Sequence, residues 1–365
     1  MKVGILTFHR ADNYGAVLQC YALQQTIREL GHEVSVIDYR QPFIEGWYSK
    51  YMRTFGVKHF FKISLKEKLP YLFERLNYDI KVRFVEHPLR RKEFAKFREK
   101  FLCLTSPCND GVPKGFDVYV IGSDMLWARE CMGWQLDYVY WGDFEHDKSS
   151  RIIGYAISTT PASMVYCNEH DVFRKLGNFT SLSLRESVIA EYIKEKTGRE
   201  YPVCIDPTLL LDAESWSPLI KKEWSKRKYI LTYYLRVPFN KRIEIRKRLE
   251  ILAEETDCEI IDIDKNFGRV TVEDFVSLIK FAQYMVTDSF HGVVFSVIFD
   301  RSVHSIRHYN PMDARSVDLL SYLQIPQALS DMNIDPEIVE IDYEAVRERL
   351  SNLRVGSLNY LKENL

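Results

Sequence analysis

The chain has 365 residues, of which 46% are hydrophobic and 28% are charged, and its formal net charge at pH 7 is −1. This is the composition of an ordinary globular protein, and the charge balance gives no electrostatic basis for binding nucleic acid. A chain of this length predicts two domains, because single hydrophobic cores rarely grow to this size.

The first apolar strand, at residues 3–8, leads into a polar turn at residues 9–15. Apolar side chains at helical spacing follow over residues 16–30, and a second strand at residues 33–38 completes a βαβ unit. Open parallel sheets bind ligands at the carboxyl ends of such strands. Ligand contacts are therefore expected at the start of this helix, from Asn13, Tyr14 and Gly15.

The N-terminus enters this strand without a recognisable signal peptide, and no apolar run approaches the roughly 18 residues of a membrane span. We therefore expect a cytoplasmic protein. The seven cysteines lack the paired spacing of metal ligands, and several lie in apolar segments, as reduced buried thiols do. The nine histidines do not cluster with them, so no metal site is expected.

A basic and aromatic stretch follows the second strand, from residue 41 to about residue 110. Its apolar residues recur at helical spacing, which predicts an insertion of helices and loops in the first domain. Within it, the run Arg90-Arg91-Lys92 is typical of a solvated helix face. The run is also compatible with a lid, or with a docking surface for an anionic acceptor.

Two further strands each end in a polar turn. The strand at residues 116–121 is followed by Ser123 and Asp124, and the strand at residues 151–157 is followed by Ser158. In a parallel sheet these turns share an edge with the turn at the start of the first helix. They are therefore expected to line one crevice.

A second series of strands and helices starts near residue 181. Residues 181–184 form a short strand that runs into an amphipathic helix, with Arg185 at the junction. A guanidinium group at such a junction is able to hold a carboxylate or phosphate through two parallel hydrogen bonds. The alternative role for Arg185 is an ion pair with Glu186 or Glu191.

The turn at residues 284–292 has the clearest pattern of an anion site. An apolar strand ends at Asp288 and Ser289, and an apolar helix follows with His291 in its first turn. Unpaired backbone N–H groups and the helix dipole attract anions to a helix N-terminus. Alternatively, Asp288 and Ser289 only cap the helix, and Gly292 allows it to approach the sheet closely.

Further polar positions follow this turn. His304 and His308 flank a strand-like segment at residues 302–306, and a metal role is not expected of them. Arg315 lies in a polar turn at residues 311–316 and is a further candidate for binding an anion.

The alternation of strands and helices predicts an α/β fold with two Rossmann-like, doubly wound domains. We assign residues 1–178 to the N-terminal domain, residues 179–342 to the C-terminal domain and residues 343–365 to a C-terminal helix. This is a glycosyltransferase-B-like arrangement, in which the site lies in a cleft between the domains.

Several short motifs form a series along the chain. They are Gly4-Ile-Leu-Thr-Phe-His9, Asn13-Tyr-Gly-Ala-Val-Leu-Gln19, Ile121-Gly-Ser-Asp124 with Trp127, Leu184-Arg-Glu186, Asp206-Pro-Thr-Leu-Leu-Leu211 and Thr287-Asp-Ser-Phe-His-Gly292. The series resembles the polysaccharide pyruvyl transferase family, whose motifs occur in this order. Together the motifs are more specific than any one of them.

The resemblance implies an enzyme that transfers the pyruvyl group of phosphoenolpyruvate to a sugar of a surface or capsular polysaccharide precursor. A cyclic pyruvate ketal forms and phosphate is released, with no cofactor besides the donor. The C-terminal domain would hold the donor, and the N-terminal domain would face the saccharide acceptor.

The resemblance also implies roles for individual residues. His291 is expected to act as a general acid or phosphate ligand, and Arg185 to bind the anionic groups of the donor. Asp124 is expected to orient or deprotonate an acceptor hydroxyl group. Substrate contacts are expected from Asn13, Tyr14, Gly15, Ser123, Ser158, Asp288, Ser289, Gly292 and Arg315.

The chain departs from the family pattern on the presumed acceptor side. Met125, Ala128 and Arg129 follow Asp124 where many relatives have other residues, and Thr159-Thr160-Pro161 follows Ser158. The acceptor sugar is therefore not predicted. A lipid-linked acceptor at the inner face of a membrane would suit the basic, aromatic insertion and would imply peripheral membrane association.

Two other functions are compatible with this architecture. One is a nucleotide-sugar-dependent glycosyltransferase, and the other is a non-catalytic binding protein of polysaccharide assembly. The sequence does not indicate the oligomeric state.

Overall fold

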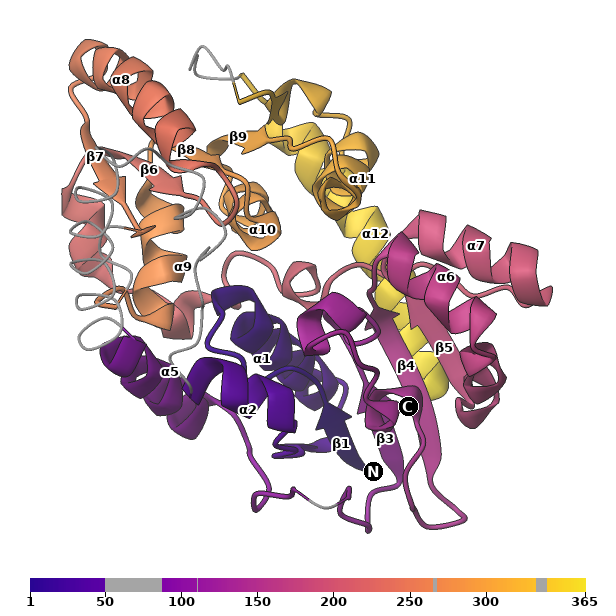
Figure 1. The fold of residues 1–365 in the computed structure, drawn as a ribbon. Coiled ribbons are helices and arrows are strands. Elements are labelled where there is room, and N and C mark those ends of the chain that lie inside the picture. The colour runs from indigo at the N-terminus through magenta and orange to yellow at the C-terminus, as the bar shows by residue number, and fades with distance from the viewer. Residues whose placement is uncertain (50–86, 110, 265–267, 333–339) are drawn as a thin grey trace, which may run out of the picture.

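The computed structural model describes residues 1–49, 87–109, 111–264, 268–332 and 340–365. These residues form two α/β domains, each built on a parallel sheet of five strands flanked by helices (Figure 1). The predicted fold, two Rossmann-like domains in a glycosyltransferase-B-like arrangement, is therefore confirmed.

The two sheets share one strand order. The first runs β2-β1-β3-β4-β5 and the second runs β7-β6-β8-β9-β10, so that each has the order 2-1-3-4-5 in its own chain numbering. In such a sheet the connections leave in opposite directions on either side of the first strand, and ligands bind at that point. The N-terminus of α1 follows β1 and His291 follows β8, which are strands at this point in the two sheets, whereas Arg185 follows the edge strand β5.

The strands of the first sheet are β1 (Lys2–Leu6), β2 (Glu33–Val36), β3 (Val118–Ile121), β4 (Arg151–Ile157) and β5 (Ser181–Leu184). Those of the second are β6 (Tyr229–Tyr233), β7 (Glu259–Asp262), β8 (Tyr284–Thr287), β9 (Ser302–Ile306) and β10 (Leu329–Ser330). The strands β3, β6 and β8 are buried along their whole length, as expected for parallel strands that are covered on both faces.

The helices of the first domain are α1 (Tyr14–Glu29), α2 (Pro42–Ser49), α5 (His87–Phe101), α6 (Pro161–Glu169) and α7 (Ser187–Thr197). The second domain contains α8 (Phe239–Glu255), α9 (Val272–Phe281), α10 (Phe290–Ile298) and α11 (Ala314–Tyr322).

The strand β5 belongs to the first domain, and the boundary predicted at residue 178 separates it from its own sheet. It pairs with β4 in parallel, with Ser181 opposite Ile153. The sequence pattern identified the strand correctly, but a four-residue apolar pattern does not say which strand it pairs with. Arg185, at the end of β5, is therefore presented by the first domain and not by the second.

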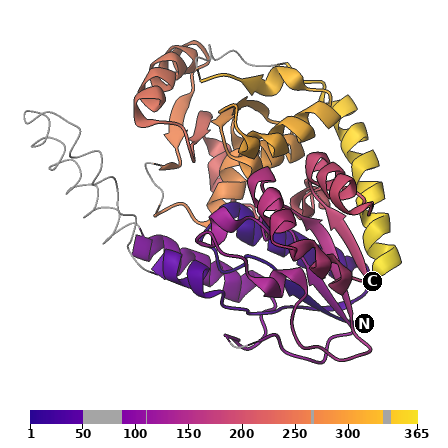
Figure 2. The ribbon, with the colours of Figure 1, turned by 45° about the vertical axis from the view of Figure 1, so that its right-hand side comes forward.

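The last helix, α12 (Tyr343–Asn364), connects the two domains (Figure 2). Near its start, the Arg349 guanidinium donates to the Leu323 carbonyl of the second domain at 3.1 Å. At its end, the Tyr360 hydroxyl donates to the Gly154 carbonyl of the first domain at 2.8 Å. Figures 1 and 2 both show the chain ending close to where it begins.

The helix α5 is the described part of the predicted insertion, together with α2; the residues between them lie outside the described part of the chain. Arg91 and Lys92 are exposed, as the sequence suggested, but Arg90 is buried. Its guanidinium donates to the Asp12 carbonyl at 2.9 Å and lies over the Tyr14 ring. This arginine therefore fixes the turn before α1 and does not form part of a docking surface.

The two domains pack through one apolar core that includes residues of both. At its centre, the Tyr14 ring stacks on the Phe275 ring with a centroid distance of 4.3 Å. The Tyr14 hydroxyl donates to the Val270 carbonyl at 2.8 Å. Tyr14, predicted to contact substrate, thus fixes the N-terminus of α1 against α9 of the other domain.

Candidate active site

The helix α10 begins at the carboxyl edge of the second sheet and holds His291 in its first turn. Ser289 caps this helix, because its hydroxyl oxygen accepts the N–H of Gly292 at 3.3 Å. A Cβ atom on Gly292 would lie 2.8 Å from the Thr287 hydroxyl oxygen, so only glycine permits this approach to the sheet. The capping and close-approach roles suggested for these two residues are therefore confirmed.

His291 of α10 faces the N-terminus of α1, a helix of the first domain. A Cβ atom on Gly15 would lie only 2.0 Å from Nδ1 of His291, so the imidazole ring rests directly on the glycine backbone. Asn13 caps α1 through its side-chain oxygen, which accepts the N–H of Gly15 at 2.9 Å. The N-termini of α1 and α10 thus meet at His291, and both helix dipoles favour an anion there.

A buried cluster of charges lies beside this imidazole. Nη1 of Arg185 donates to Oδ2 of Asp206 at 2.6 Å, and Nε donates to Oε1 of Glu186 at 3.2 Å. Burial disfavours the charge of Arg185, but the carboxylates of Glu186 and Asp206 outweigh this and raise its pKa. The guanidinium therefore stays charged.

Asp206 links Arg185 to His291. Its Oδ2 lies 3.6 Å from Nε2 of His291, while its Oδ1 accepts the N–H and the hydroxyl group of Thr208 at 3.0 Å and 2.6 Å. Burial would raise the pKa of Asp206, but His291 and Arg185 outweigh it and hold the pKa well below its usual range. The carboxylate is thus ionised at neutral pH and lies beside the imidazole of His291.

Two donors in this cluster lack partners. Nη2 of Arg185 and Nε2 of His291 are buried and have no hydrogen-bond partner among the described residues. Buried polar groups are almost always paired, so a further molecule, either a water or a ligand, is expected beside these two atoms.

Arg315 adds a second guanidinium group. The Arg185 and Arg315 guanidinium carbons lie 5.3 Å and 5.4 Å from the centre of the Phe290 ring. In the described part of the chain Arg315 has no hydrogen bond or ion pair, and burial together with the charge of Arg185 lowers its pKa. Two cations beside one apolar ring form a cluster that is suited to an anion with an apolar part.

The turns of the first sheet contribute two further polar side chains, Asp124 and Ser158, near this cluster. Asp124 adopts a left-handed backbone with φ of 84°, and its carboxylate accepts the N–H of Met125 at 2.8 Å. Its charge also acts on Arg185 and Arg315. The Ser158 hydroxyl donates to Oε1 of Glu186 at 2.5 Å. Its role in the site is therefore to hold the Glu186 carboxylate in position.

Two predicted contacts have structural roles instead. Ser123 is fully buried and donates to the Ala156 carbonyl at 2.7 Å. Asp288 does not cap α10, because its carboxylate accepts the backbone N–H groups of Leu235 and Arg236 at 2.6 Å and 2.7 Å. It also lies 2.8 Å from Nε2 of His308, and so joins three loops of the second domain.

Asp206, Glu186 and Phe290 were not predicted as site residues. Two signals were present in the sequence, since Glu186 follows Arg185 directly and Asp206 opens a motif of its own. Neither signal states that Arg185 lies between the two carboxylates, because Asp206 is 21 positions away from it in the chain.

A separate, partly buried carboxyl group lies at the carboxyl edge of the second sheet. Asp264 accepts the N–H of Tyr234 at 2.9 Å and a hydrogen bond from Arg242 at 3.2 Å. Burial nevertheless raises the pKa of Asp264 to about 7. In the unfolded chain the same group ionises near pH 4, at about its reference value. Its contribution to stability is therefore present below about pH 4 and is lost as the pH rises to about 7.

Asp264→Asn is expected to remove this pH dependence. Between pH 5 and pH 8 the free energy of unfolding should fall by about 2 kcal/mol less in the variant than in the parent. Urea denaturation at both pH values measures the difference. Asp171→Asn, at an exposed carboxyl group, is the matched control. An equal fall in the parent and in Asp264→Asn would contradict the raised pKa.

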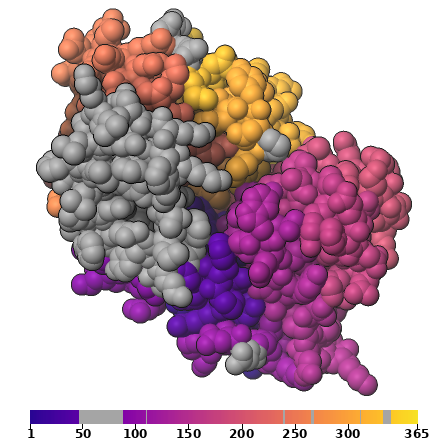
Figure 3. Space-filling model, in the orientation of Figure 1, coloured from indigo at the N-terminus to yellow at the C-terminus, as the bar shows by residue number. Residues whose placement is uncertain are grey.

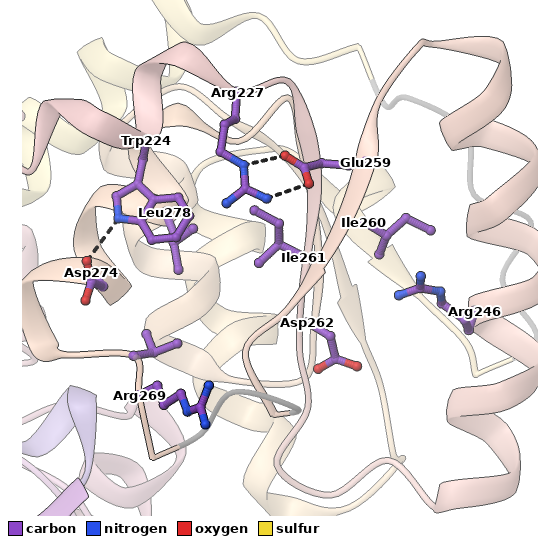
Figure 4. A pocket seen from close by; sticks show the side chains of 11 residues that line it. Trp224, Arg227, Arg246, Glu259, Ile260, Ile261, Asp262, Arg269, Asp274 and Leu278 are labelled. Carbon is purple, nitrogen blue, oxygen red and sulfur yellow. Dashed lines mark hydrogen bonds and ion pairs between the residues drawn. The ribbon is translucent and has the colours of Figure 1, made fainter. Parts of the chain in front are cut away.

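A cavity of about 450 Å³ lies elsewhere, along β7 (Figure 4). Two pairs of its polar side chains bond to each other: Arg227 donates twice to Glu259 at 2.5 Å, and the Trp224 indole donates to Asp274 at 3.0 Å. None of the side chains described around His291 and Arg185 lines this cavity. The N-termini of α1 and α10 meet where the two domains face each other. Figure 3 shows the surface recessed between the magenta segments and the yellow and orange segments.

In the described ranges, no group of three or more His, Cys, Asp or Glu side chains is arranged to hold a metal ion. Within the same ranges, none of the helices combines the length and the apolar character that a membrane span requires.

Comparison with known proteins identifies one family. A family model described as polysaccharide pyruvyl transferase matches residues 13–310, which is most of the chain. No curated protein matches the sequence significantly.

Solved structures align with this chain at low sequence identity and with TM-scores below 0.5. The UDP-GlcNAc 2-epimerase from Methanocaldococcus jannaschii aligns with a TM-score of 0.46 and 11% identity, over 96% of this chain and 92% of that one. The E. coli heptosyltransferase WaaC with ADP aligns with a TM-score of 0.38 and 10% identity, over 97% of this chain and 100% of that one.

Proposed function

The chain belongs to the polysaccharide pyruvyl transferase family, and on this basis we propose that it transfers the pyruvyl group of phosphoenolpyruvate to a sugar of a surface or capsular polysaccharide precursor. The reaction forms a cyclic pyruvate ketal and releases phosphate. One observation carries the proposal: Nη2 of Arg185, the guanidinium of Arg315 and Nε2 of His291 make no hydrogen bond within the described residues, and the three side chains lie around Phe290 where two helix N-termini meet.

The cluster of Arg185, Arg315 and Phe290 suits the charges and the apolar part of this donor. Phosphoenolpyruvate carries a phosphate and a carboxylate on one enol carbon, with an apolar methylene group beside them. Nη2 of Arg185 and the guanidinium of Arg315 are available for the two anionic groups, and both guanidinium carbons lie within 5.4 Å of the centre of the Phe290 ring. Because these side chains and the helix N-termini supply the positive charge, we propose that the donor binds without a metal ion or other cofactor.

His291 is suited to give a proton to the methylene carbon. Its Nε2 makes no hydrogen bond within the described residues and lies 3.6 Å from Oδ2 of the ionised Asp206. As the methylene carbon gains this proton, a sugar hydroxyl oxygen bonds to the neighbouring enol carbon. A second hydroxyl oxygen then bonds to that carbon as its bond to phosphate breaks. Of the two hydroxyl protons, one replaces the proton of His291 and the other leaves with phosphate.

We further propose that the saccharide acceptor approaches from the first domain, where Asp124 is available to orient a hydroxyl group. A lipid-linked acceptor would bring the protein to the cytoplasmic face of a membrane as a peripheral protein. The basic helix α5 is compatible with this, since Arg91 and Lys92 on it are exposed.

Arg315→Ala is expected to weaken phosphoenolpyruvate binding by about 10- to 100-fold, the value of one or two charge-assisted hydrogen bonds. The free energy of unfolding should change by less than about 1 kcal/mol, because Arg315 has no ion pair to lose within the described residues. Calorimetric titration of the parent and the variant with phosphoenolpyruvate, in the presence of a chelator, measures the change. Arg174→Ala, at an exposed arginine, is the control.

The same titration with a panel of nucleotide sugars separates this function from glycosyl transfer. Saturable binding of phosphoenolpyruvate alone supports the proposal. Binding of a nucleotide sugar, with no heat from phosphoenolpyruvate, would contradict it and would favour a glycosyltransferase of the same architecture.

A further inference from the structure

Glu186 is a buried acidic side chain next to Arg185 in the charged cluster. It is only 4% exposed and occupies the N-cap position of α7, yet its side chain makes no capping hydrogen bond. Its carboxylate instead turns to the end of β5, towards Arg185 and Ser158. The two oxygens of this carboxylate then differ in their environment.

Of the two oxygens of the Glu186 carboxylate, one accepts two hydrogen bonds and the other accepts none within the described residues. Oε1 accepts the Ser158 hydroxyl at 2.5 Å and Nε of Arg185 at 3.2 Å. Oε2 is buried and has no hydrogen-bond partner among the described residues. A buried carboxylate oxygen without a donor is costly, so a donor from another molecule is expected to occupy this position.

The surroundings of Oε2 exclude the donor's anions as its partner, because carboxylate and phosphate groups repel it. Its charge acts on Arg315, although the two side chains form no ion pair. A group that fits beside a carboxylate and close to two guanidinium groups must carry a polar hydrogen and no negative charge. A sugar hydroxyl group has this chemistry.

We propose that Oε2 of Glu186 binds the attacking hydroxyl group of the saccharide acceptor and takes its proton. This inference rests on the proposed pyruvyl transfer and assigns the base of that reaction. As the hydroxyl oxygen bonds to the enol carbon, its proton moves to Oε2, and the electron pair of the double bond takes a proton from His291 at the methylene carbon.

The second step returns Glu186 and His291 to their starting protonation states. The second hydroxyl oxygen bonds to the same carbon as the bond to phosphate breaks, and phosphate leaves with the electron pair of that bond. The second hydroxyl proton moves to His291, and Glu186 gives its proton to the departing phosphate. Ser158 and Arg185 position the carboxylate throughout, because they hold its other oxygen.

Glu186 is better placed for this step than Asp124, the residue first expected to take it. Asp124 is only partly buried, and one of its oxygens already accepts the N–H of Met125. Asp124 then remains available to orient the second hydroxyl group.

Glu186→Gln tests the assignment, because it keeps the shape of the side chain and removes its ability to take a proton. Phosphate release from phosphoenolpyruvate, in the presence of a panel of methyl and p-nitrophenyl glycosides, should fall by about 100-fold or more at saturating donor. Calorimetric affinity for phosphoenolpyruvate should stay within about threefold of the parent, since no donor contact is lost. Glu191→Gln, at an exposed carboxylate on the same helix, should behave like the parent.

The possible outcomes are distinct. Parent-like phosphate release in Glu186→Gln would overturn the assignment. So would a loss of phosphoenolpyruvate binding in this variant, which would show that Glu186 only holds Arg185 in place. Parent protein that binds the donor but releases phosphate with none of the glycosides would contradict a base at this position. Parent protein that binds no phosphoenolpyruvate would instead contradict the proposed function itself.

Discussion

Gly15→Ala is expected to reduce the turnover of the enzyme by at least about 100-fold, although alanine is a better helix former than glycine. The added Cβ atom would lie 2.0 Å from Nδ1 and 2.3 Å from Cε1 of His291. The helix α1 cannot retreat, because the Asn13 side chain caps it and Tyr14 is stacked on Phe275 of the other domain. The imidazole has to move, and a displacement of about 1 Å at a reacting group costs about 100-fold in rate.

Donor-dependent phosphate release measures this effect, and urea denaturation of the same protein shows whether the variant is folded. A loss of stability of about 1–3 kcal/mol is expected from the forced contact. Gly177→Ala is the matched control, because a Cβ atom there meets no other atom within 4 Å. Full activity in Gly15→Ala would show that His291 does not need its position against α1.

The sequence was sufficient to predict the fold because its strands and helices have distinct periods. Buried strands such as β3 and β8 appear as continuous apolar runs, and α1 follows a polar turn with regular apolar spacing. Strand pairing is a different property. The pairing of β5 with β4 depends on the packing of distant segments, so the domain boundary at residue 178 was misplaced.

The candidate site was predictable where one motif holds both the residue and its support. His291, Ser289 and Gly292 lie within a single turn, and the structure gives the last two the capping and close-approach roles expected of them. Contacts between motifs were not predictable. Neither the contact of Gly15 with His291 nor the ion pair of Arg185 with Asp206 has a signal in sequence spacing, because each joins segments that only the folded chain brings together.

Arg185→Ala is expected to abolish detectable binding of phosphoenolpyruvate and to lower the free energy of unfolding by about 3–5 kcal/mol. Both effects have one cause, since this guanidinium is buried between Asp206 and Glu186 and also provides the free Nη2. Its removal leaves two buried carboxylates without their cation. Urea denaturation and calorimetric titration of the same variant measure the two effects.

Arg185→Lys separates the structural role from the donor role. A lysine keeps the positive charge, and its single ammonium group is able to pair with one of the two carboxylates, so part of the lost stability should return. Donor binding should remain at least about tenfold weaker than in the parent, because one ammonium group cannot replace the guanidinium fork that holds Asp206, Glu186 and the donor together. Recovery of stability and donor affinity together in Arg185→Lys would show that charge alone is required. Recovery of stability without donor affinity would assign recognition of phosphoenolpyruvate to the geometry of the guanidinium group.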